Sequence, residues 1–215
     1  MRDLISAAMR ECTSLHCRFR YPDINVIDFF AQCPKCHEKA GIIHVIDLTR
    51  SDNHSNANDL RSHNVICILD NIRSVYNVGS LFRTMQGFGI SEAILGGITP
   101  TPSHIKFRKT SMGAEEDVRW YSANNAFEQC QSLKNNGYML IAIEASSESK
   151  PIRLFEPPDE RKKIAFIVGN EIIGIDPSIL KLCDQILSIP IVGRNKSYNV
   201  TVAFGIGLYA CLSMP

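Results

Sequence analysis

Beyond residue 64, short apolar runs alternate along the chain with segments of helical periodicity. The runs are 65–70 (VICILD), 92–97 (EAILGG), 138–145 (YMLIAIEA), 163–169 (KIAFIVG) and 185–192 (QILSIPIV). A strand that is solvated on one face alternates apolar with polar residues, whereas a strand covered on both faces is apolar nearly throughout. The sequence therefore predicts an α/β fold, with a mostly parallel sheet and helices on both faces.

Three helices are predicted between and after these runs. Asn77 is expected to cap the first, whose apolar stripe faces inward and turns Arg83 away from the core. A second helix is expected near Pro177, because proline suits the first helical turn, and a third after Asn199. The inward stripe of the first helix is Val78, Leu81, Met85 and Phe88, and the small residues on one face of the third are Ala203, Gly207 and Ala210.

A chain of 215 residues is long enough for one main domain and a smaller unit. Residues 50–64 are rich in Asn, Ser, His and Asp, a composition that cannot bury enough apolar surface to order itself. We therefore predict a small domain at 1–49, a polar linker at 50–64 and a main domain at 65–215. No segment has the apolar length that spans a bilayer, and the first residues carry charges, so we expect a cytoplasmic protein.

The predicted small domain contains two close cysteine pairs, whose spacing is typical of a zinc ribbon. They are Cys12, Cys17, Cys33 and Cys36. Four thiolates around one zinc ion leave no position for water, so the zinc would be structural and would stabilise a segment that has little core. His16 and His37 are alternatives to a neighbouring cysteine, and four ordinary buried thiols are the competing interpretation. The remaining cysteines lie in apolar surroundings and are expected in the core: Cys67, Cys130, Cys183 and Cys211.

Three polar motifs accompany the predicted elements of the main domain. They are NVGSLFR at 77–83, GNEIIG at 169–174 and SYNVTVA at 197–203. Gly79 and Arg83 share one helical face, which would let a ligand backbone approach the guanidinium. The second motif ends a strand, where ligands of open α/β sheets bind. Each motif alone has an ordinary explanation as an exposed arginine, a capped turn or a helix cap.

Together, and with KTSMGAEEDV at 109–118, these motifs resemble those of the SpoU (TrmH-like) family of the SPOUT superfamily, whose members are RNA 2′-O-ribose methyltransferases. The resemblance begins near Val65 and leaves out the preceding segment. It implies a C-terminal deep trefoil knot, which is an exception to the rule that chains are unknotted. It also implies a homodimer with the active site at the interface, S-adenosylmethionine as methyl donor, and a ribose 2′-hydroxyl of tRNA or rRNA as acceptor.

The resemblance assigns roles to the residues of the matching motifs. Arg83 would orient the nucleophile and stabilise charge, because a guanidinium is a poor general base, and Asn77 and Glu171 would hold it in place. The implied catalytic set is Asn77, Arg83, Glu171, Ser197 and Asn199. The implied donor-binding set is Ile143, Gly169, Asn170, Ile189, Tyr198 and Asn199. Candidates for phosphate contacts are Lys106, Arg108, Lys109, Arg194 and Lys196.

Two other functions stay open at the level of sequence. A net charge of +1 gives no overall attraction to RNA, so binding would depend on the basic runs 104–109, 160–163 and 193–196. A non-catalytic RNA-binding protein could keep both the fold and these runs, and a base-nitrogen methyltransferase could share the knot. The chain departs from the usual family pattern at Tyr198, where Leu is common, and at Ile191, where Met is frequent. No G-x-G-x-x-G follows the first strand, which argues against a Rossmann-type enzyme.

Overall fold

The computed structural model describes residues 6–24, 31–47, 65–156 and 163–212. The chain divides into two compact units, Met1–Ser55 and Asn56–Pro215. The segment 50–64, which the sequence suggests as a linker, lies outside the described residues. Within the described part, no helix is long and apolar enough to cross a membrane.

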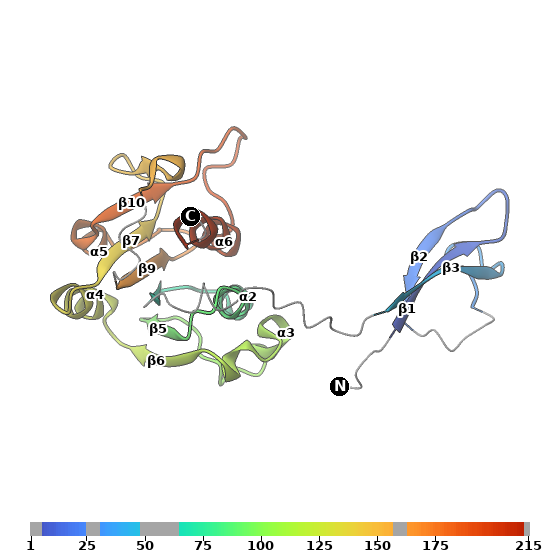
Figure 1. Ribbon diagram of the computed structural model, residues 1–215, viewed down its shortest axis with the longest axis horizontal. Coiled ribbons are helices and arrows are strands. Elements are labelled where there is room, and N and C mark those ends of the chain that lie inside the picture. Colours follow the sequence, from blue (N-terminus) through green and yellow to red (C-terminus); the bar gives the residue numbers. More distant parts are fainter. Residues whose placement is uncertain (1–5, 25–30, 48–64, 157–162, 213–215) are drawn as a thin grey trace. The chain divides into compact units, whose positions relative to one another are not determined.

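The first unit is a three-stranded antiparallel sheet (Figure 1). Its strands, in the order β2-β1-β3, are β1 (Ser6–Cys12), β2 (Arg20–Asp23) and β3 (Ala40–Asp47). The buried Arg10 side chain crosses the sheet to the carboxylate of Asp23, with 2.6 Å between Nε and Oδ2. Since a buried charge is stable only when it is paired, this ion pair holds the register of β1 against β2.

The second unit is built on a seven-stranded sheet in the order β6-β5-β4-β9-β7-β10-β8. Every described pairing in it is parallel, which confirms the predicted α/β fold with a mostly parallel sheet. All six residues of the central strands β4 and β9 are buried. The strands are β4 (Val65–Asp70), β5 (Glu92–Gly96), β6 (Arg119–Ala123), β7 (Met139–Ile143), β8 (Lys150–Pro151), β9 (Ile164–Gly169) and β10 (Gln185–Ser188).

Helices cover both faces of this sheet, as the apolar runs predict (Figure 1). Helices α2 and α6 pack with α3 on one face, and α4 and α5 pack on the other. The helices are α2 (Val75–Gly87), α3 (Arg108–Ser111), α4 (Ala126–Asn135), α5 (Pro177–Leu182) and α6 (Val200–Leu212), with 3-10 turns η1 (Ala114–Glu116) and η2 (Ile152–Leu154). The apolar runs therefore form a sheet that lies between two layers of helices.

Helix α2 begins earlier than the sequence suggests. The N-cap is Ser74, whose Oγ accepts a hydrogen bond from the N–H of Asn77, so the expectation that Asn77 itself is the cap is wrong. Asn77 sits in the first turn instead, where its side chain is free to bond outside the helix. Three of the four predicted stripe residues, Val78, Leu81 and Met85, are fully buried, and Phe88 packs against the same cluster.

Gly79 does not make room for a ligand. A Cβ at this position would lie 2.9 Å from the carbonyl oxygen of Phe107 and 2.2 Å from Oγ1 of Thr110. The missing side chain lets α2 and α3 pack closely, and the chain itself fills the space that the sequence suggests for a ligand.

Helix α6 uses its small residues in a similar way. A Cβ on Gly207 would lie 2.8 Å from the ring of Phe166 in β9 and 2.9 Å from Ile143 in β7. The absent side chain therefore lets α6 pack directly against β7 and β9.

The packing of α2 against α3 predicts the effect of a single methyl group. Gly79→Ala should lower the free energy of unfolding by about 1–3 kcal/mol, because the backbone of α3 must move. The control is Gly87→Ala in the same helix, where a Cβ meets nothing within 4 Å and stability should be unchanged or rise by up to about 1 kcal/mol. Urea denaturation of both variants measures the difference, and equal stabilities would contradict the packing argument.

Candidate active site

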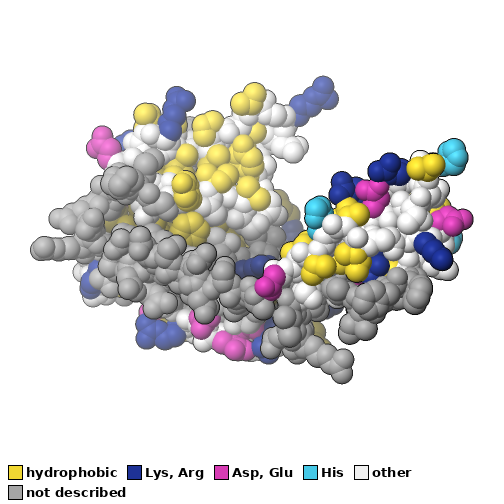
Figure 2. Space-filling view, turned by 45° about the vertical axis from the view of Figure 1, so that its right-hand side comes forward, with side chains coloured by type: hydrophobic (Ala, Val, Ile, Leu, Met, Phe, Trp, Pro, Cys, Tyr) yellow, Lys and Arg dark blue, Asp and Glu magenta, His cyan; other side chains and the backbone are white. Residues whose placement is uncertain are grey.

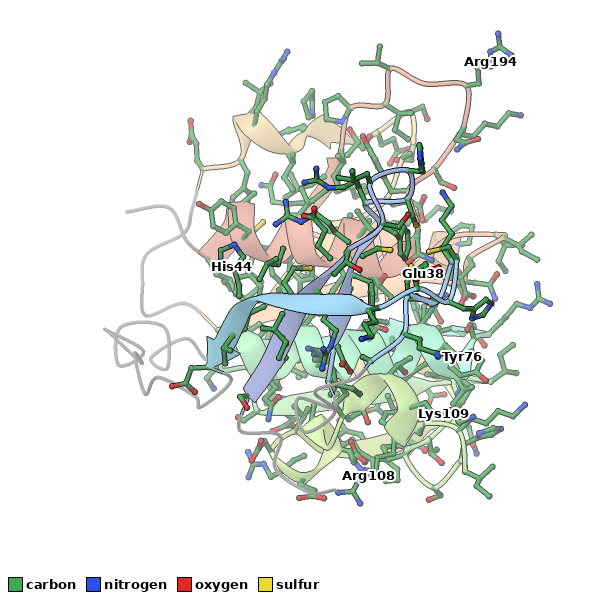
Figure 3. The ribbon with its side chains drawn as sticks, turned by 90° about the vertical axis from the view of Figure 1, so that its right-hand side faces the viewer. Glu38, His44, Tyr76, Arg108, Lys109 and Arg194 are labelled. Atoms are coloured by element: carbon green, nitrogen blue, oxygen red, sulfur yellow. The ribbon has the colours of Figure 1, made fainter. Side chains whose placement is uncertain are left out.

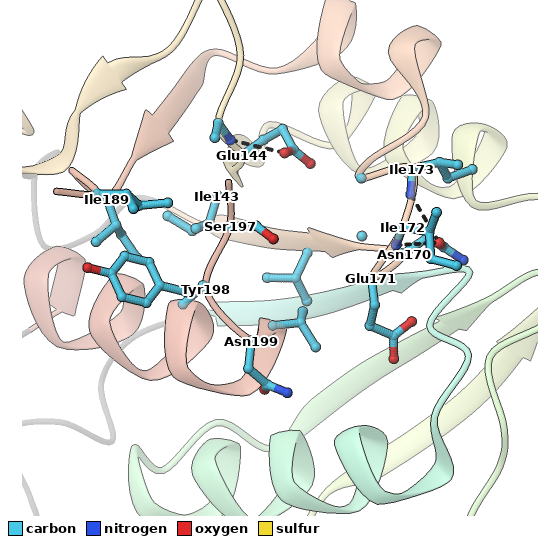
Figure 4. Close-up of a pocket in the computed structure, with 17 residues that line it drawn as sticks. Ile143, Glu144, Asn170, Glu171, Ile172, Ile173, Ile189, Ser197, Tyr198 and Asn199 are labelled. Atoms are coloured by element: carbon cyan, nitrogen blue, oxygen red, sulfur yellow. Dashed lines mark hydrogen bonds between the residues drawn. The ribbon is translucent and has the colours of Figure 1, made fainter. Parts of the chain in front are cut away.

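A cavity of about 380 Å³ opens at the carboxyl ends of β7 and β9, beside the segment that joins β10 to α6 (Figure 4). This is the edge of the sheet where ligands of open α/β folds bind. All six residues suggested as donor-binding line it: Ile143, Gly169, Asn170, Ile189, Tyr198 and Asn199. Of the suggested catalytic residues, Glu171, Ser197 and Asn199 line it as well.

The loop after β9 forms one wall of the cavity, and Asn170 gives it its shape. The Asn170 side chain accepts hydrogen bonds from the N–H groups of Ile172 and Ile173 and donates one to the carbonyl of Asn71, at 2.9, 3.2 and 2.7 Å. Backbone bonds in both directions join Asn170 to Gly174. The amide of Asn170 is thus used within the protein to close the loop.

The two glycines of this loop serve the chain's own packing. A Cβ on Gly169 would lie 2.5 Å from the carbonyl carbon of Gly174, and a Cβ on Gly174 would lie 2.4 Å from Oε2 of Glu144. Gly174 also has a φ of +76°, in the left-handed region that favours glycine. Both glycines let the loop fold tightly at the cavity wall.

Glu171 joins this loop to the start of α2. Its carboxylate accepts hydrogen bonds from the backbone N–H groups of Arg73 and Ser74, at 2.9 and 3.1 Å, and from Nδ2 of Asn77, at 2.7 Å. Burial raises the pKa of this carboxyl, but the donors from Arg73, Asn77 and Ser74 outweigh burial and hold the pKa below its ordinary value. An ionised carboxylate at a helix N-terminus is also favoured by the helix dipole.

Asn199 completes a hydrogen-bonded chain through all three sequence motifs. Its Nδ2 lies 3.5 Å from Oδ1 of Asn77, and Nδ2 of Asn77 donates to Glu171. Its Oδ1 accepts from the N–H of Thr201 at 2.8 Å, so Asn199 also caps the first turn of α6. Figure 4 shows Glu171 and Asn199 pointing to the same side of the cavity. Residues 122 positions apart in the chain thus meet at one mouth.

Arg83 lies outside the cavity and outside this chain of hydrogen bonds. Its exposed guanidinium donates to Sδ of Met112 at 3.0 Å, so the structure does not support the expectation that Asn77 and Glu171 hold it. The reason is its position in α2: Arg83 follows Asn77 by six residues, about 1.7 helical turns, so the two side chains leave the helix in different directions. Arg83 lines a neighbouring groove of about 540 Å³ with hydroxyl and lysine side chains. The other groove residues are Ser80, Thr84, Lys109, Thr110, Thr201 and Val202.

The groove and the cavity are linked through Thr201. Its Oγ1 donates to Oδ1 of Asn199 at 2.6 Å, while the residue itself lines the groove beside Arg83. Ser197 and Tyr198, which directly precede Asn199, line the cavity as well, and the Tyr198 hydroxyl donates to the carbonyl of Pro190 at 3.2 Å. A ligand in the cavity and a second one in the groove would therefore both lie next to Asn199.

Sequence reasoning missed Glu144, which lines the cavity directly after β7. It is the first charged residue after a buried strand that ends at the ligand-binding edge of the sheet, and that position is the signal that could have found it. The backbone donors of Arg73 and Ser74 were missed as well. Nothing in their side chains marks them, because only the fold brings their N–H groups to Glu171.

The four cysteines suggested as metal ligands come together in the first unit. Their sulfur atoms all lie within 4.8 Å of one another, and all four thiols are free. The Cys12–Cys36 and Cys17–Cys33 sulfur distances are 3.4 and 3.8 Å. His16 and His37 are not part of this group. Of the cysteines expected in the core, Cys67, Cys130 and Cys211 are buried and Cys183 is half-buried.

Each cysteine pair ends in the same backbone turn. The residue after the second cysteine, Arg18 or His37, has a positive φ, of 46° and 63° respectively. In the second turn the N–H of Lys35 donates to Sγ of Cys33 at 3.4 Å. Burial opposes ionisation of Cys33, but backbone donors from Cys36 and Lys35 lower its pKa to about 7. Two such turns facing each other present four sulfurs to a common centre.

The structure thus has a doubly covered parallel sheet, a cavity at its carboxyl edge and three sequence motifs joined at the cavity mouth. Residues 64–209 match the SpoU rRNA Methylase family. The chain belongs to this family.

Relatives of known name are also similar to this chain. The tRNA (guanosine(18)-2′-O)-methyltransferase of Aquifex aeolicus is 28% identical over 149 residues, which cover 69% of each chain. The 23S rRNA (guanosine-2′-O-)-methyltransferase RlmB of Neisseria meningitidis serogroup B is 28% identical over 172 residues, covering 78% of this chain and 66% of the relative. The chain spans only 56% of a putative TrmH family tRNA/rRNA methyltransferase of Staphylococcus saprophyticus, to which it is 26% identical.

Two solved structures share the fold. The A. aeolicus TrmH/SpoU tRNA modifying enzyme superposes with a TM-score of 0.62 at 27% identity, covering 72% of this chain and 79% of that one. The AdoMet-bound rRNA methyltransferase from Sinorhizobium meliloti superposes with a TM-score of 0.63 at 24% identity, covering 77% and 61%.

The hydrogen bonds at Glu171 predict a pH-dependent contribution to stability. A carboxyl whose pKa is lower in the folded protein than in the unfolded chain stabilises the fold above the unfolded value, and this contribution disappears as the pH falls. Glu171→Gln should therefore cost about 1 kcal/mol at pH 7, and its difference from wild type should shrink below the ordinary pKa of 4.5.

Denaturant titrations at several pH values measure this difference. Glu148→Gln is the control, because Glu148 is exposed and makes no hydrogen bond or ion pair within the described residues. The loss of unfolding free energy in Glu171→Gln could instead stay constant from pH 7 to below the ordinary pKa. That result would show that the ionised carboxylate does not stabilise the fold.

Proposed function

We propose that this chain is an S-adenosylmethionine-dependent RNA methyltransferase that transfers a methyl group to a ribose 2′-hydroxyl of tRNA or rRNA in the cytoplasm. The observation that carries the proposal is the hydrogen-bonded chain from Asn199 through Asn77 to Glu171. It joins the three family motifs at the mouth of one cavity. The names of the tRNA- and rRNA-modifying relatives support the same substrate class.

The cavity suits the methyl donor in size and lining. Small-molecule pockets are commonly about 300–1,000 Å³ and mostly apolar, with a few placed polar groups, and this one measures about 380 Å³. Ile143, Ile189 and Ile191 offer apolar contacts, and the loop at 170–174 offers backbone. When bound there, the donor would supply an activated methyl group. The proposed donor-binding residues all line the cavity and are Ile143, Gly169, Asn170, Ile189, Tyr198 and Asn199.

Arg83 is proposed to act from the neighbouring groove. A guanidinium stays protonated at physiological pH, so Arg83 would orient the ribose and stabilise charge, and would not remove the proton. Asn199 and Asn77 would keep the cavity mouth and the groove in a fixed relation. Ser197, which lines the cavity at the same mouth, is proposed to position the acceptor.

Basic side chains for the RNA backbone are available on two segments. Arg108 and Lys109 project from α3, and Arg194 extends from the segment between β10 and α6 (Figure 3). Lys109 lines the groove that holds Arg83. With Lys106 and Lys196 they are the proposed phosphate contacts, which position an RNA without reading its sequence. Most of the basic run 160–163 lies outside the described residues.

A homodimer is proposed from the outer surfaces of α2 and α6, which pack beside each other. Val202, Ile206 and Tyr209 recur along one face of α6 and are exposed by 49%, 38% and 68%. Tyr76 on α2 adds an exposed aromatic ring. Apolar residues at this spacing on a helix surface are typical of an interface, and a partner there would lie next to the groove of Arg83. The C-terminal segment is proposed to form the trefoil knot of the superfamily.

Structural zinc is proposed for the four cysteines of the first unit. Four thiolates about 2.3 Å from a zinc ion are about 3.8 Å apart in a tetrahedron, close to the sulfur distances of 3.4 and 3.8 Å. The N–H of Lys35 that donates to Cys33 is the kind of second contact that supports a thiolate ligand. With four sulfur donors the zinc would hold the fold and take no part in the reaction.

This unit is proposed to grip the RNA substrate. Phe19 and Tyr21 stack with 6.0 Å between ring centroids, and Lys35 Nζ lies 6.0 Å from the Phe19 centroid. Hydrophobic, basic and histidine side chains lie close together on the face that Figure 2 shows. Exposed rings beside cations suit unstacked RNA bases. A non-catalytic RNA-binding protein would share this feature, so the methyl-transfer test below distinguishes the two functions.

Methyl transfer tests the function and the role of Arg83 together. Incubation with total RNA and labelled donor should label RNA at positions that resist alkaline cleavage, since a 2′-O-methyl group blocks that reaction. Arg83→Ala should keep donor affinity but lose transfer by a factor of about 10² or more. Arg119→Ala, which removes an exposed arginine on β6 paired with Glu92, should transfer normally.

Other outcomes identify the competing functions. Donor binding without any incorporation would indicate a non-catalytic RNA-binding protein, and label at alkali-sensitive positions would indicate a base methyltransferase. Wild-type turnover in Arg83→Ala would remove Arg83 from the mechanism.

Metal analysis tests the cysteine site. The purified protein should contain about one zinc per chain, and Cys33→Ser should lose it and unfold the first unit, because metal binding supplies folding free energy. Cys183→Ser, which changes a half-buried thiol of the other unit, should keep the metal. Four freely titrating N-terminal thiols in a zinc-free wild-type protein would end the proposal.

A further inference from the structure

The cavity lining contains acidic residues but no basic residue to balance their charge. Two carboxylates line it, those of Glu144 and Glu171, and no Lys, Arg or His is among its described lining residues. No ion pair joins either glutamate to a cation in the part of the chain that the structure describes. An ionised group in such a place is stabilised by a ligand of opposite charge.

The two carboxylates differ in how much of their hydrogen-bonding capacity is used. Glu171 accepts from Arg73, Ser74 and Asn77 and is committed to the start of α2. Glu144 accepts one bond on each oxygen, from the N–H of Ala145 at 3.0 Å and from the N–H of Ile175 at 2.9 Å. A carboxylate has about four acceptor positions, so Glu144 keeps capacity for a ligand.

The position of Glu144 is fixed from two sides. It follows β7 directly, and its Oε2 is seated against Gly174, where a Cβ would lie only 2.4 Å away. Figure 4 shows it at the rim of the cavity, across from Glu171. A charge held by two backbone donors does not need to reorganise when a ligand arrives.

Because the cavity is small, the Glu144 carboxylate lies close to any group bound inside it. A space of 380 Å³ is roughly 9 Å across if it is compact, which is about one Debye length at physiological salt. Any cationic group inside it therefore lies within range of Glu144, in surroundings less polar than water, where opposite charges attract more strongly.

We propose that Glu144 is a specificity-determining residue that makes the cavity select the cationic methyl donor over the neutral product. This inference rests on the proposed function. S-adenosylmethionine carries one net positive charge because of its sulfonium, whereas S-adenosylhomocysteine has a neutral sulfide and no net charge. A carboxylate without a protein counter-ion favours the first, and it weakens product binding relative to donor binding after each transfer.

Binding of three ligands tests the proposal by isothermal titration calorimetry. The ligands are S-adenosylmethionine, S-adenosylhomocysteine and sinefungin, which carries an ammonium group in place of the sulfonium. In the wild type both cationic ligands should bind more tightly than S-adenosylhomocysteine. Glu144→Gln should weaken both cationic ligands about tenfold and change S-adenosylhomocysteine by less than about twofold.

Two further variants keep the test independent of folding. Glu148→Gln removes an exposed carboxylate from the segment after Glu144 and should leave all three affinities unchanged. Glu144→Asp keeps the charge and should restore most of the preference for cationic ligands, even if all three bind more weakly.

The outcomes separate this inference from the proposed function. Equal weakening of all three ligands in Glu144→Gln would mean that Glu144 only supports the loop at Ile175, and would overturn the inference. Unchanged affinities would overturn it as well. A wild-type protein that binds none of the three ligands would contradict the proposed function itself.

Discussion

The site depends on the hydrogen bonds that the carboxylate of Glu171 accepts from the start of α2. Two backbone N–H groups before α2 and the side chain of Asn77 all donate to it. These donors come from a segment almost a hundred residues earlier in the chain, so the contact fixes the loop after β9 against the start of α2. Because Asn77 also meets Asn199, the same contact sets where α6 begins. The cavity mouth is the space that these constraints leave between three elements.

Much of the fold follows from the apolar runs. A run such as 164–169 has no polar face and is short, which favours a strand covered on both sides, and all of β9 is buried. Segments with weaker patterns were not identified. Strand β6 has no buried residue, because it lies at the edge of the sheet and reads as a polar segment. Helix α3 has four residues, too few to show a period.

The site could be predicted only in part, for a physical reason. The motif residues that line the cavity lie at the ends of strands and helices, where an element's position in the sheet determines its neighbours. The partner of Arg83 could not be inferred, since Met112 reaches it from a left-handed turn after α3. Gly79 and Gly169 look like ligand-binding glycines in sequence, yet backbone of the protein itself fills the space beside each. Sequence shows that a side chain is missing but does not show what takes its place.

Gly174 meets two separate demands. Its φ of +76° favours glycine, and its lack of a Cβ leaves room for the carboxylate of Glu144. The first demand does not depend on the residue at 144, whereas the second does. A shorter residue at 144 removes the steric demand but leaves the conformational one, which asparagine tolerates better than other side chains. Among relatives with this loop, a glutamate at 144 should therefore accompany glycine at 174, and asparagine at 174 should accompany a small residue at 144.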